Sequence, residues 1–233
     1  NDKCILKNLK LSENLKILPV GSLRFDYDNK NNNLKKIFKK NEKKTVLFLT
    51  GNTVRQRNQY YFGINREKNE TSFWEFHYDI LCLLQKYQKK YNVILKDYPN
   101  GRKNLWQKIL KDINADNISY ISNERTVNEL MQISDLNIMP WISTTFFESL
   151  YFDADVFVIE KDMFKEAFEN QLKNEIFIFD NNEKFKTNLN KYLLEEKFYQ
   201  YEKKTSREYL LSFDYLNKRD KLLNKALDSF LKN

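Results

Sequence analysis

The chain has 233 residues, and its 40 Lys and Arg against 32 Asp and Glu give a formal net charge of +8. With 4 Gly and 3 Pro, it is poor in the residues that an all-β fold with many tight turns requires. Its 2 Cys form no CxxC pair and its 1 His stands alone, so neither a disulfide framework nor a zinc site is expected, and no apolar run approaches the roughly 20 residues of a membrane-spanning helix.

From residue 45 onward, short apolar runs alternate with amphipathic segments. The apolar runs predict strands over residues 45–49, 93–95, 118–121, 136–139, 156–159 and 176–179. The amphipathic segments predict helices over residues 73–91, 105–113 and 123–133, a short helix that carries Glu148, and a mostly helical stretch over 185–233. This alternation predicts an α/β, Rossmann-like fold, in which a parallel sheet has helices on both faces and a helical C-terminal tail follows.

Two helices contain residues whose roles can be interpreted locally. Asn123 is the expected N-cap of helix 123–133, and Thr126 with Glu129 repeats the capping pattern three residues later. His77 lies in the middle of helix 73–91 among aromatic residues, so we expect it to be structural rather than a general base.

Polar segments follow several of the predicted strands. In open α/β sheets, ligands bind at the carboxyl ends of the strands, so these segments are candidate binding loops. Their candidate residues are Gly51, Asn52, Thr53, Lys96, Pro99, Arg102, Ser143, Thr144 and Thr145. The last three stand at a helix start, where free N–H groups and the positive end of the helix dipole suit a phosphate, although plain N-capping is an equally good interpretation.

Charged and aromatic residues near these loops allow two interpretations each. Arg24, Lys96 and Arg102 are either fixed cations that neutralise a diphosphate or ordinary solvated basic side chains. The carboxylate of Glu148 either accepts two hydroxyl groups of a ribose or lies on a helix surface. Trp141 is a candidate platform for stacking a base, whereas core packing is favoured for the neighbouring Phe146 and Phe147.

Four segments carry a resemblance to a known family. Gly21, Ser22 and Arg24 stand in a segment that is similar to a "GS-x-R" motif, and residues 45–52 look like a first nucleotide-domain strand with its loop. Residues 93–99 (VILKDYP) are similar to a "hydrophobic strand–K-x-H-P" segment, with Tyr98 where His is usual. Residues 134–148 look like an "SD–hydrophobic–S/T-S/T–xx-E" element. In this order, over about residues 18–179, the segments resemble the C-terminal, donor-binding half of a GT-B glycosyltransferase from bacterial surface-carbohydrate biosynthesis, of the capsule and teichoic-acid type.

The resemblance implies roles for particular residues. In such enzymes the Glu of the last element, here Glu148, commonly binds the donor ribose, and the hydroxyl residues before it commonly face the diphosphate. Together with the loops at the strand ends, the donor-binding set is therefore expected to comprise Gly21, Ser22, Arg24, Gly51, Asn52, Thr53, Lys96, Pro99, Arg102, Ser143, Thr144, Thr145 and Glu148. One departure is that residues 153–156 (DADV) stand where the family has a "G-x-P-V" turn.

The resemblance also implies a reaction and a setting. It implies inverting, metal-independent transfer of a nucleotide-activated sugar or polyol phosphate to a glycan or lipid-linked acceptor, in the cytoplasm or at the inner membrane face, without a cofactor. Residues 1–184 would form the nucleotide-sugar-binding domain, and the helices of 185–233 would pack on it or on a preceding N-terminal domain. Because a GT-B enzyme needs two Rossmann-like domains, that preceding domain would supply the acceptor site and the catalytic base.

Two other functions stay open on the sequence alone. One is different nucleotide-sugar chemistry on the same fold, such as epimerisation. The other is a non-catalytic α/β module that binds a partner protein or RNA through its basic surface. Nucleic acid is disfavoured because the basic residues are not concentrated in one segment, whereas the aromatic and basic run over residues 198–215 fits contact with a membrane surface or a partner domain.

Overall fold

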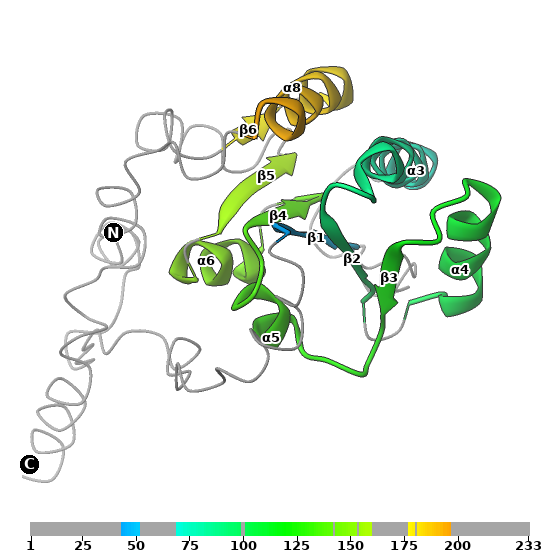
Figure 1. Ribbon diagram of the computed structural model, residues 1–233, viewed down its shortest axis with the longest axis horizontal. Helices are drawn as coiled ribbons and strands as arrows, with labels where there is room; N and C mark the ends of the chain where they lie inside the picture. The colour runs from blue at the N-terminus through cyan, green and yellow to red at the C-terminus, as the bar shows by residue number, and fades with distance from the viewer. Residues whose placement is uncertain are drawn as a thin grey trace, which may run out of the picture. The chain divides into compact units, whose positions relative to one another are not determined.

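The computed structural model describes residues 43–51, 69–98, 101–141, 143–152, 154–159, 177–179 and 181–196 of the chain (Figure 1). All of these residues belong to one compact unit, residues 28–206. Within the described residues, no helix is both long enough and apolar enough to cross a membrane.

A single sheet of parallel strands forms the centre of this unit. The strands are β1 Thr45–Leu49, β2 Asn92–Lys96, β3 Ile118–Ile121, β4 Leu136–Met139, β5 Asp155–Ile159 and β6 Phe177–Phe179. They lie in the order β3-β2-β1-β4-β5-β6, and every neighbouring pair is parallel. Each predicted strand is present, shifted by at most one residue at either end, so the predicted Rossmann-like α/β fold is confirmed.

The central strands are buried along their whole length. Every residue of β1, β4 and β5 is buried, which explains why these strands are continuous apolar runs rather than alternating ones. The chain leaves β1 toward β2 and β3 and then crosses back to β4 on the other side of β1. The strand order therefore reverses between β1 and β4, and this is the position where folds of this kind bind their ligands.

Helices cover both faces of the sheet (Figure 1). They are α3 Asn69–Tyr87, α4 Lys103–Asp112, α5 Val127–Met131, α6 Thr144–Tyr151 and α8 Asn182–Glu195. Side chains of α3, α4 and α8 share one hydrophobic cluster with β1, β2 and β5. Buried side chains of α5 and α6, such as Leu130 and Phe146, lie outside that cluster, as expected for helices on the opposite face.

Aromatic rings fill the space between the sheet and the first helix layer. His77 is fully buried, and its ring stacks on Phe48 with 5.3 Å between centroids. Phe76 meets it edge-on at 5.4 Å, and Trp106 of α4 lies 5.6 Å away. The only histidine of the chain is thus part of the core, as predicted. Its ring packs against those of Phe48, Phe76 and Trp106.

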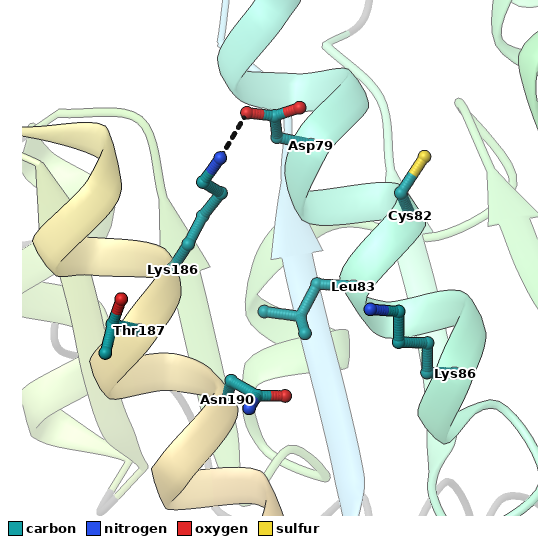
Figure 2. Close-up of a pocket in the computed structure, with 7 residues that line it drawn as sticks. All are labelled: Asp79, Cys82, Leu83, Lys86, Lys186, Thr187 and Asn190. Atoms are coloured by element: carbon teal, nitrogen blue, oxygen red, sulfur yellow. Dashed lines mark hydrogen bonds and ion pairs between the residues drawn. The ribbon is translucent and has the colours of Figure 1, made fainter.

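Helices α3 and α8 lie side by side and leave a groove of about 350 Å³ between them (Figure 2). The groove is polar: Lys186 of α8 forms an ion pair with Asp79 of α3, with 2.8 Å between nitrogen and oxygen, and a second one with Glu183. Hydrogen bonding to Asp79 and then to Glu183 raises the pKa of Lys186, so its charge is held against these two carboxylates.

The two ends of α8 have different anchors. At the start, the Asn181 side chain caps the helix by accepting a hydrogen bond from Lys184 N at 2.9 Å. At the end, the Tyr91 hydroxyl donates to Leu193 O at 2.7 Å, and the Lys90 ammonium donates to the same carbonyl at 3.1 Å. Glu196 then adopts a left-handed conformation with φ of 55°, which ends the helix.

The predicted helical stretch over 185–233 therefore begins earlier, at Asn182, and its first helix ends at Glu195. Residues beyond 196 lie outside the described part of the chain. The predicted domain boundary at residue 184 falls inside α8, and the two-part organisation of the chain stays a prediction.

Helix α5 is shorter than the predicted helix 123–133. It begins at Val127 because Thr126 is its N-cap: the Thr126 hydroxyl accepts from Glu129 N, and the Glu129 carboxylate accepts from Thr126 N at 2.8 Å. The predicted N-cap Asn123 is therefore wrong. Residues 122–125 form a bend instead, in which Ser122 N donates to the Glu124 carboxylate at 2.6 Å.

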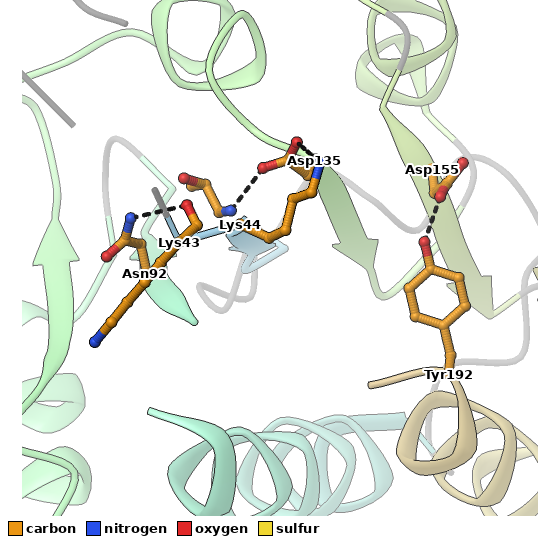
Figure 3. Close-up of polar contacts among 7 residues, drawn as sticks. Lys43, Lys44, Asn92, Asp135, Asp155 and Tyr192 are labelled. Carbon is orange, nitrogen blue, oxygen red and sulfur yellow. Dashed lines mark hydrogen bonds and ion pairs between the residues drawn. The ribbon is translucent and has the colours of Figure 1, made fainter. Parts of the chain in front are cut away.

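Buried aspartates fix the amino ends of the central strands (Figure 3). The Asp135 carboxylate accepts a hydrogen bond from Thr45 N at 2.7 Å and lies 3.4 Å from the Lys44 ammonium. Asp155, which opens β5, accepts a hydrogen bond from the Tyr192 hydroxyl of α8. The DADV segment thus supplies a carboxylate that ties α8 to β5, where the resembled family has a glycine turn.

We expect Tyr192→Phe to lower the free energy of unfolding by about 1–3 kcal/mol, because the buried Asp155 carboxylate loses a donor that water cannot replace. Urea denaturation followed by circular dichroism measures this. The matched control is Tyr87→Phe, which removes an exposed hydroxyl contact to Asn190 at 2.9 Å in the α3–α8 layer and should cost less than about 0.5 kcal/mol. Equal losses for the two variants would contradict the assignment.

Candidate functional site at the carboxyl edge of the sheet

The loops that follow β1, β2 and β4 meet at the carboxyl edge, around the point where the strand order reverses. Thr50 and Gly51 follow β1, residues 97–102 follow β2, and residues 140–143 lead from β4 into α6. Backbone hydrogen bonds join these strand ends. Thr50 N donates to Lys96 O at 3.0 Å, between β1 and β2, and Asp97 N donates to Ile121 O at 2.9 Å, between the loop after β2 and the end of β3.

One buried carboxylate joins three of the strand ends. Asp97 is 1% exposed, and its Oδ1 accepts hydrogen bonds from the Thr50 hydroxyl at 2.9 Å, from Trp106 Nε1 at 3.0 Å and from Tyr98 N at 2.8 Å. Its Oδ2 accepts from the Tyr120 hydroxyl at 2.9 Å. Because these donors come from the loops after β1 and β2, from α4 and from β3, Asp97 fixes the edge as one unit.

The loop after β2 is shaped around this carboxylate. Gly101 N donates to Tyr98 O at 2.7 Å, which brings these two residues of the loop together. A Cβ on Gly101 would fall 2.0 Å from Oδ2 of Asp97, so no larger residue fits without moving the carboxylate. The sequence "KDYPNGR" therefore encodes a buried acid and the glycine that makes room for it.

Lys96 points into the protein at this edge. It is 4% exposed, and its ammonium donates to Asp97 O at 2.8 Å and to Ser122 O. Burial lowers the pKa of Lys96, and the nearby carboxylates of Asp97 and then Glu124 act in the opposite direction. The cation thus ties the loop after β2 to the residue that follows β3, and its predicted contact with a phosphate stays a prediction.

Tyr120 is the titratable neighbour of Asp97 on β3. Burial, followed by its hydrogen bond to the Asp97 carboxylate, raises the pKa of Tyr120 to about 12. The phenol therefore keeps its proton, and its bond to Asp97, well above the pH at which an exposed tyrosine ionises.

Gly51 has an aromatic neighbour at the reversal point. A Cβ on Gly51 would fall 1.7 Å from Cη2 of Trp141, and 2.3 Å and 2.4 Å from the adjoining ring carbons. The indole of Trp141 therefore fills the space where a side chain of residue 51 would stand. Gly51 is required here because the ring from the β4 loop lies against its backbone, and its predicted role in donor binding stays a prediction.

The hydroxyl cluster lies at the start of α6, as predicted. The hydroxyls of Ser143 and Thr145 are 2.6 Å apart, and Ser143 O accepts from Phe146 N at 3.0 Å. Thr144 is the first residue of α6, and Glu148, one turn later, is 5% exposed. Residues four apart share a helix face, so Thr144 and Glu148 are positioned on the same side of α6.

A buried polar chain holds α6 against β4. Asn137 of β4 donates through Nδ2 to the Ser149 hydroxyl at 2.9 Å, and its Oδ1 lies 2.8 Å from the Ser134 hydroxyl. All three groups are buried. Helix α6, which carries Thr145 and Glu148 and directly follows Ser143, is thereby fixed in register with β4.

The other predicted site residues differ in where they fall. Arg102 is exposed and precedes α4, whose N-cap it is without a side-chain hydrogen bond. The predicted residues that lie outside the described part of the chain are Gly21, Ser22, Arg24, Asn52, Thr53 and Pro99. None of the predicted site residues lines the groove between α3 and α8. Among the described residues, no group of three or more His, Cys, Asp and Glu side chains is arranged to hold a metal ion.

Asp97 is the residue that sequence reasoning missed. Asp97 lies between the candidate residues Lys96 and Pro99. A single Asp, however, carries no sequence pattern that distinguishes a buried acceptor from a solvated one. The available signals were Gly101, four residues later, and Trp106, nine residues later. Their contacts with Asp97 can be recognised only in the folded loop.

Three solved structures share this fold at low sequence identity. WaaG, a glycosyltransferase involved in lipopolysaccharide biosynthesis, matches 95% of this chain with a TM-score of 0.55 and 14% identity. A glycosyltransferase from Rickettsia africae ESF-5 matches 99% of it with a TM-score of 0.52 and 14% identity. The apo structure of OtsA matches 80% of it with a TM-score of 0.50 and 9% identity.

The chain spans only part of these proteins, 60% of each of the first two and 44% of OtsA. At such identities the likeness is one of fold, and the predicted resemblance to GT-B glycosyltransferases is confirmed at that level. The capsule and teichoic-acid type stays a prediction. No protein-family model matches the sequence, and no curated protein does.

We expect Asp97→Ala to lower the free energy of unfolding by about 3 kcal/mol or more, because three buried or half-buried side-chain donors lose their acceptor together. Chemical denaturation measures the loss. The matched control, Thr50→Val, removes one of these donors and leaves the others in place, so it should cost about 1 kcal/mol. A smaller effect for Asp97→Ala than for Thr50→Val would overturn the assigned role.

Stability should also depend on Tyr120 at alkaline pH. Its folded pKa of about 12 lies above the unfolded value of about 10, so its contribution is complete below the unfolded pKa and is lost as pH rises through the folded pKa. Between about pH 10 and about pH 12, the wild-type chain should therefore lose more stability than Tyr120→Phe. Denaturation midpoints of both proteins across this window test it, and parallel curves would contradict it.

Proposed function

We propose that this chain binds a nucleotide-activated donor at the carboxyl edge of its sheet and acts in glycosyl transfer. The observation that carries the proposal is the meeting of polar loops at the reversal between β1 and β4, in a fold shared with solved glycosyltransferases. Ligands of open parallel sheets bind outside this point, where backbone and side-chain donors from several loops converge.

The start of α6 supports a diphosphate position. The first N–H groups of an α-helix lack acceptors one turn earlier in the helix, and the helix dipole adds positive potential at that end. The hydroxyls of Ser143 and Thr145 lie beside these groups and can donate to phosphate oxygens. We therefore assign the donor diphosphate to Ser143, Thr144 and Thr145.

Glu148 supports a ribose position one helical turn further on. A carboxylate can accept hydrogen bonds from two adjacent hydroxyls at once, and burial strengthens such bonds by excluding water. Because α6 is held in register by the Asn137 and Ser149 contact, Glu148 is presented in one fixed position. The ribose of a donor whose diphosphate lies at the helix start would reach this carboxylate.

The finer assignment follows the sequence motifs. We propose a nucleotide-activated sugar or polyol phosphate as donor, a glycan or lipid-linked acceptor, and a role in surface polysaccharide synthesis. Arg24, Lys96 and Arg102 would provide the positive charge that stabilises the leaving nucleoside diphosphate without a metal ion. Because the chain spans about 60% of the glycosyltransferases it matches, a second domain would supply the acceptor site and the base.

Nucleotide binding by the full chain tests the proposal. Thermal shift with CMP, CDP, UDP and GDP should show stabilisation by at least one nucleotide, and Glu148→Gln should reduce the affinity for that nucleotide about ten-fold or more, since the amide removes one of the two acceptors for the ribose. The Gln side chain keeps the shape of Glu148, so folding should survive. Glu75→Gln, on an exposed position of α3, is the matched control and should bind as the wild type does.

The outcomes separate the competing functions. Stabilisation that disappears in Glu148→Gln and persists in Glu75→Gln supports the proposal. Stabilisation by no nucleotide, together with RNA binding whose affinity falls steeply with salt, would instead favour the non-catalytic module.

A further inference from the structure

Exposed aromatic side chains stand at the carboxyl edge. Among the described residues, the large hydrophobic side chains with substantial exposure are Tyr78, Tyr98, Trp141 and Leu194. Tyr98 and Trp141, with exposed fractions of 39% and 38%, follow β2 and β4 and so belong to the loops of the candidate site. The other two lie on α3 and α8, in the helix layer.

Both aromatic residues contact Thr50 and Gly51, the two described residues that follow β1. The indole of Trp141 lies against Gly51, and Tyr98 N donates to the hydroxyl of Thr50 at 3.1 Å. Asp97 strengthens the second attachment by accepting from Tyr98 N and from the Thr50 hydroxyl. Trp141 and the backbone of Tyr98 therefore contact two adjacent residues, Gly51 and Thr50, which directly follow β1.

This anchoring has an energetic consequence for ligand binding. The indole of Trp141 packs against Gly51, and a side chain that is already held in place loses little conformational entropy when a ligand contacts it. An aromatic ring with one part packed and another part in water also gains from having its exposed area covered. A planar ring is the ligand group that gains most from such a partner, because two flat faces exclude water over their whole area.

Resting on the function proposed above, we propose that Trp141 and Tyr98 form the ring-binding part of the site and that the base of the nucleotide stacks on Trp141. Trp141 and the hydroxyl cluster belong to the same loop, with Trp141 two residues before Ser143. Among the exposed aromatic residues, Trp141 is therefore the nearest in sequence to the hydroxyls to which the diphosphate is assigned. Tyr98 follows β2, on the other side of β1 from β4.

The test compares ligands with and without a base. Calorimetric titrations of the full chain would use the nucleoside diphosphates UDP, CDP, GDP and ADP, with inorganic pyrophosphate and glucose 1-phosphate as ligands that lack a base. Trp141→Ala should weaken the best nucleotide about ten-fold or more, since this is the loss expected for one base–aromatic stack. Tyr98→Ala should weaken it by a smaller factor. Pyrophosphate should bind all variants equally.

Matched variants separate stacking from packing. Trp141→Phe keeps an aromatic face and should stay within about three-fold of the wild type, whereas Trp141→Leu covers Gly51 without a π-face and should bind as weakly as Trp141→Ala. Tyr78→Ala removes an aromatic side chain of similar exposure from α3 and should leave nucleotide binding unchanged. Thermal midpoints of every variant verify that each is folded.

Three results would overturn the inference, and they are distinguishable. Nucleotide affinity that is the same in Trp141→Ala and in the wild type overturns the stacking role alone and leaves the proposed function standing. If Trp141→Ala weakens the binding of pyrophosphate as much as that of the nucleotides, or weakens only the binding of glucose 1-phosphate, then Trp141 contacts another part of the ligand. This result also overturns the stacking role. A wild-type chain that binds no nucleotide overturns this inference and the proposed function together.

Discussion

A buried carboxylate controls the geometry of the carboxyl edge. Asp97 is almost fully buried, so its carboxylate depends on the donors that surround it, and these donors come from separate elements. Each donor in turn depends on Asp97, because a buried hydroxyl or indole N–H without an acceptor is itself costly. The loops after β1 and β2, the helix α4 and the strand β3 are thus interdependent.

The opposite edge uses the same chemistry for a different purpose. Asp135 and Asp155 are also buried, but each is bound near the amino end of a strand, where it ties one strand to a neighbouring segment. At that edge the carboxylates join elements in pairs, and among the described residues no exposed large aromatic side chain is in contact with them. At the carboxyl edge the buried acid lies beneath loops that expose Tyr98 and Trp141. This asymmetry supports the proposal that the carboxyl edge is the binding side.

The strands could be predicted because burial on both faces demands continuous apolar runs, and few other structures produce such short runs at regular intervals. The start of α5 was harder, since Asn123 and Thr126 are both good N-caps and only the reciprocal bond between Thr126 and Glu129 decides between them. The position of the hydroxyl cluster at a helix start, and of Glu148 in that helix, could be predicted because both follow an apolar strand.

The environment of Gly51 could not be predicted in the same way. Sequence favours a glycine after β1 wherever a ligand or another group approaches the backbone closely, and it does not say which. The structure supplies the group, Trp141, which lies 90 positions later in the chain, in the loop after β4. Strand β4 lies beside β1 only after folding. The role of Lys96 was similarly ambiguous, because its carbonyl partners are contributed by residues on two different loops.

The pairing of β1 with β4 has a consequence for the order of folding. The hydrogen bond between Thr45 and Asp135 joins residues 90 positions apart, whereas that between Thr50 and Asp97 spans 47. The entropy of closing a loop grows with its length, so contacts within the β1–β2–β3 half can form before β4 arrives. The half that contains Asp97 would then assemble first, and the pairing of β1 with β4 would be completed late.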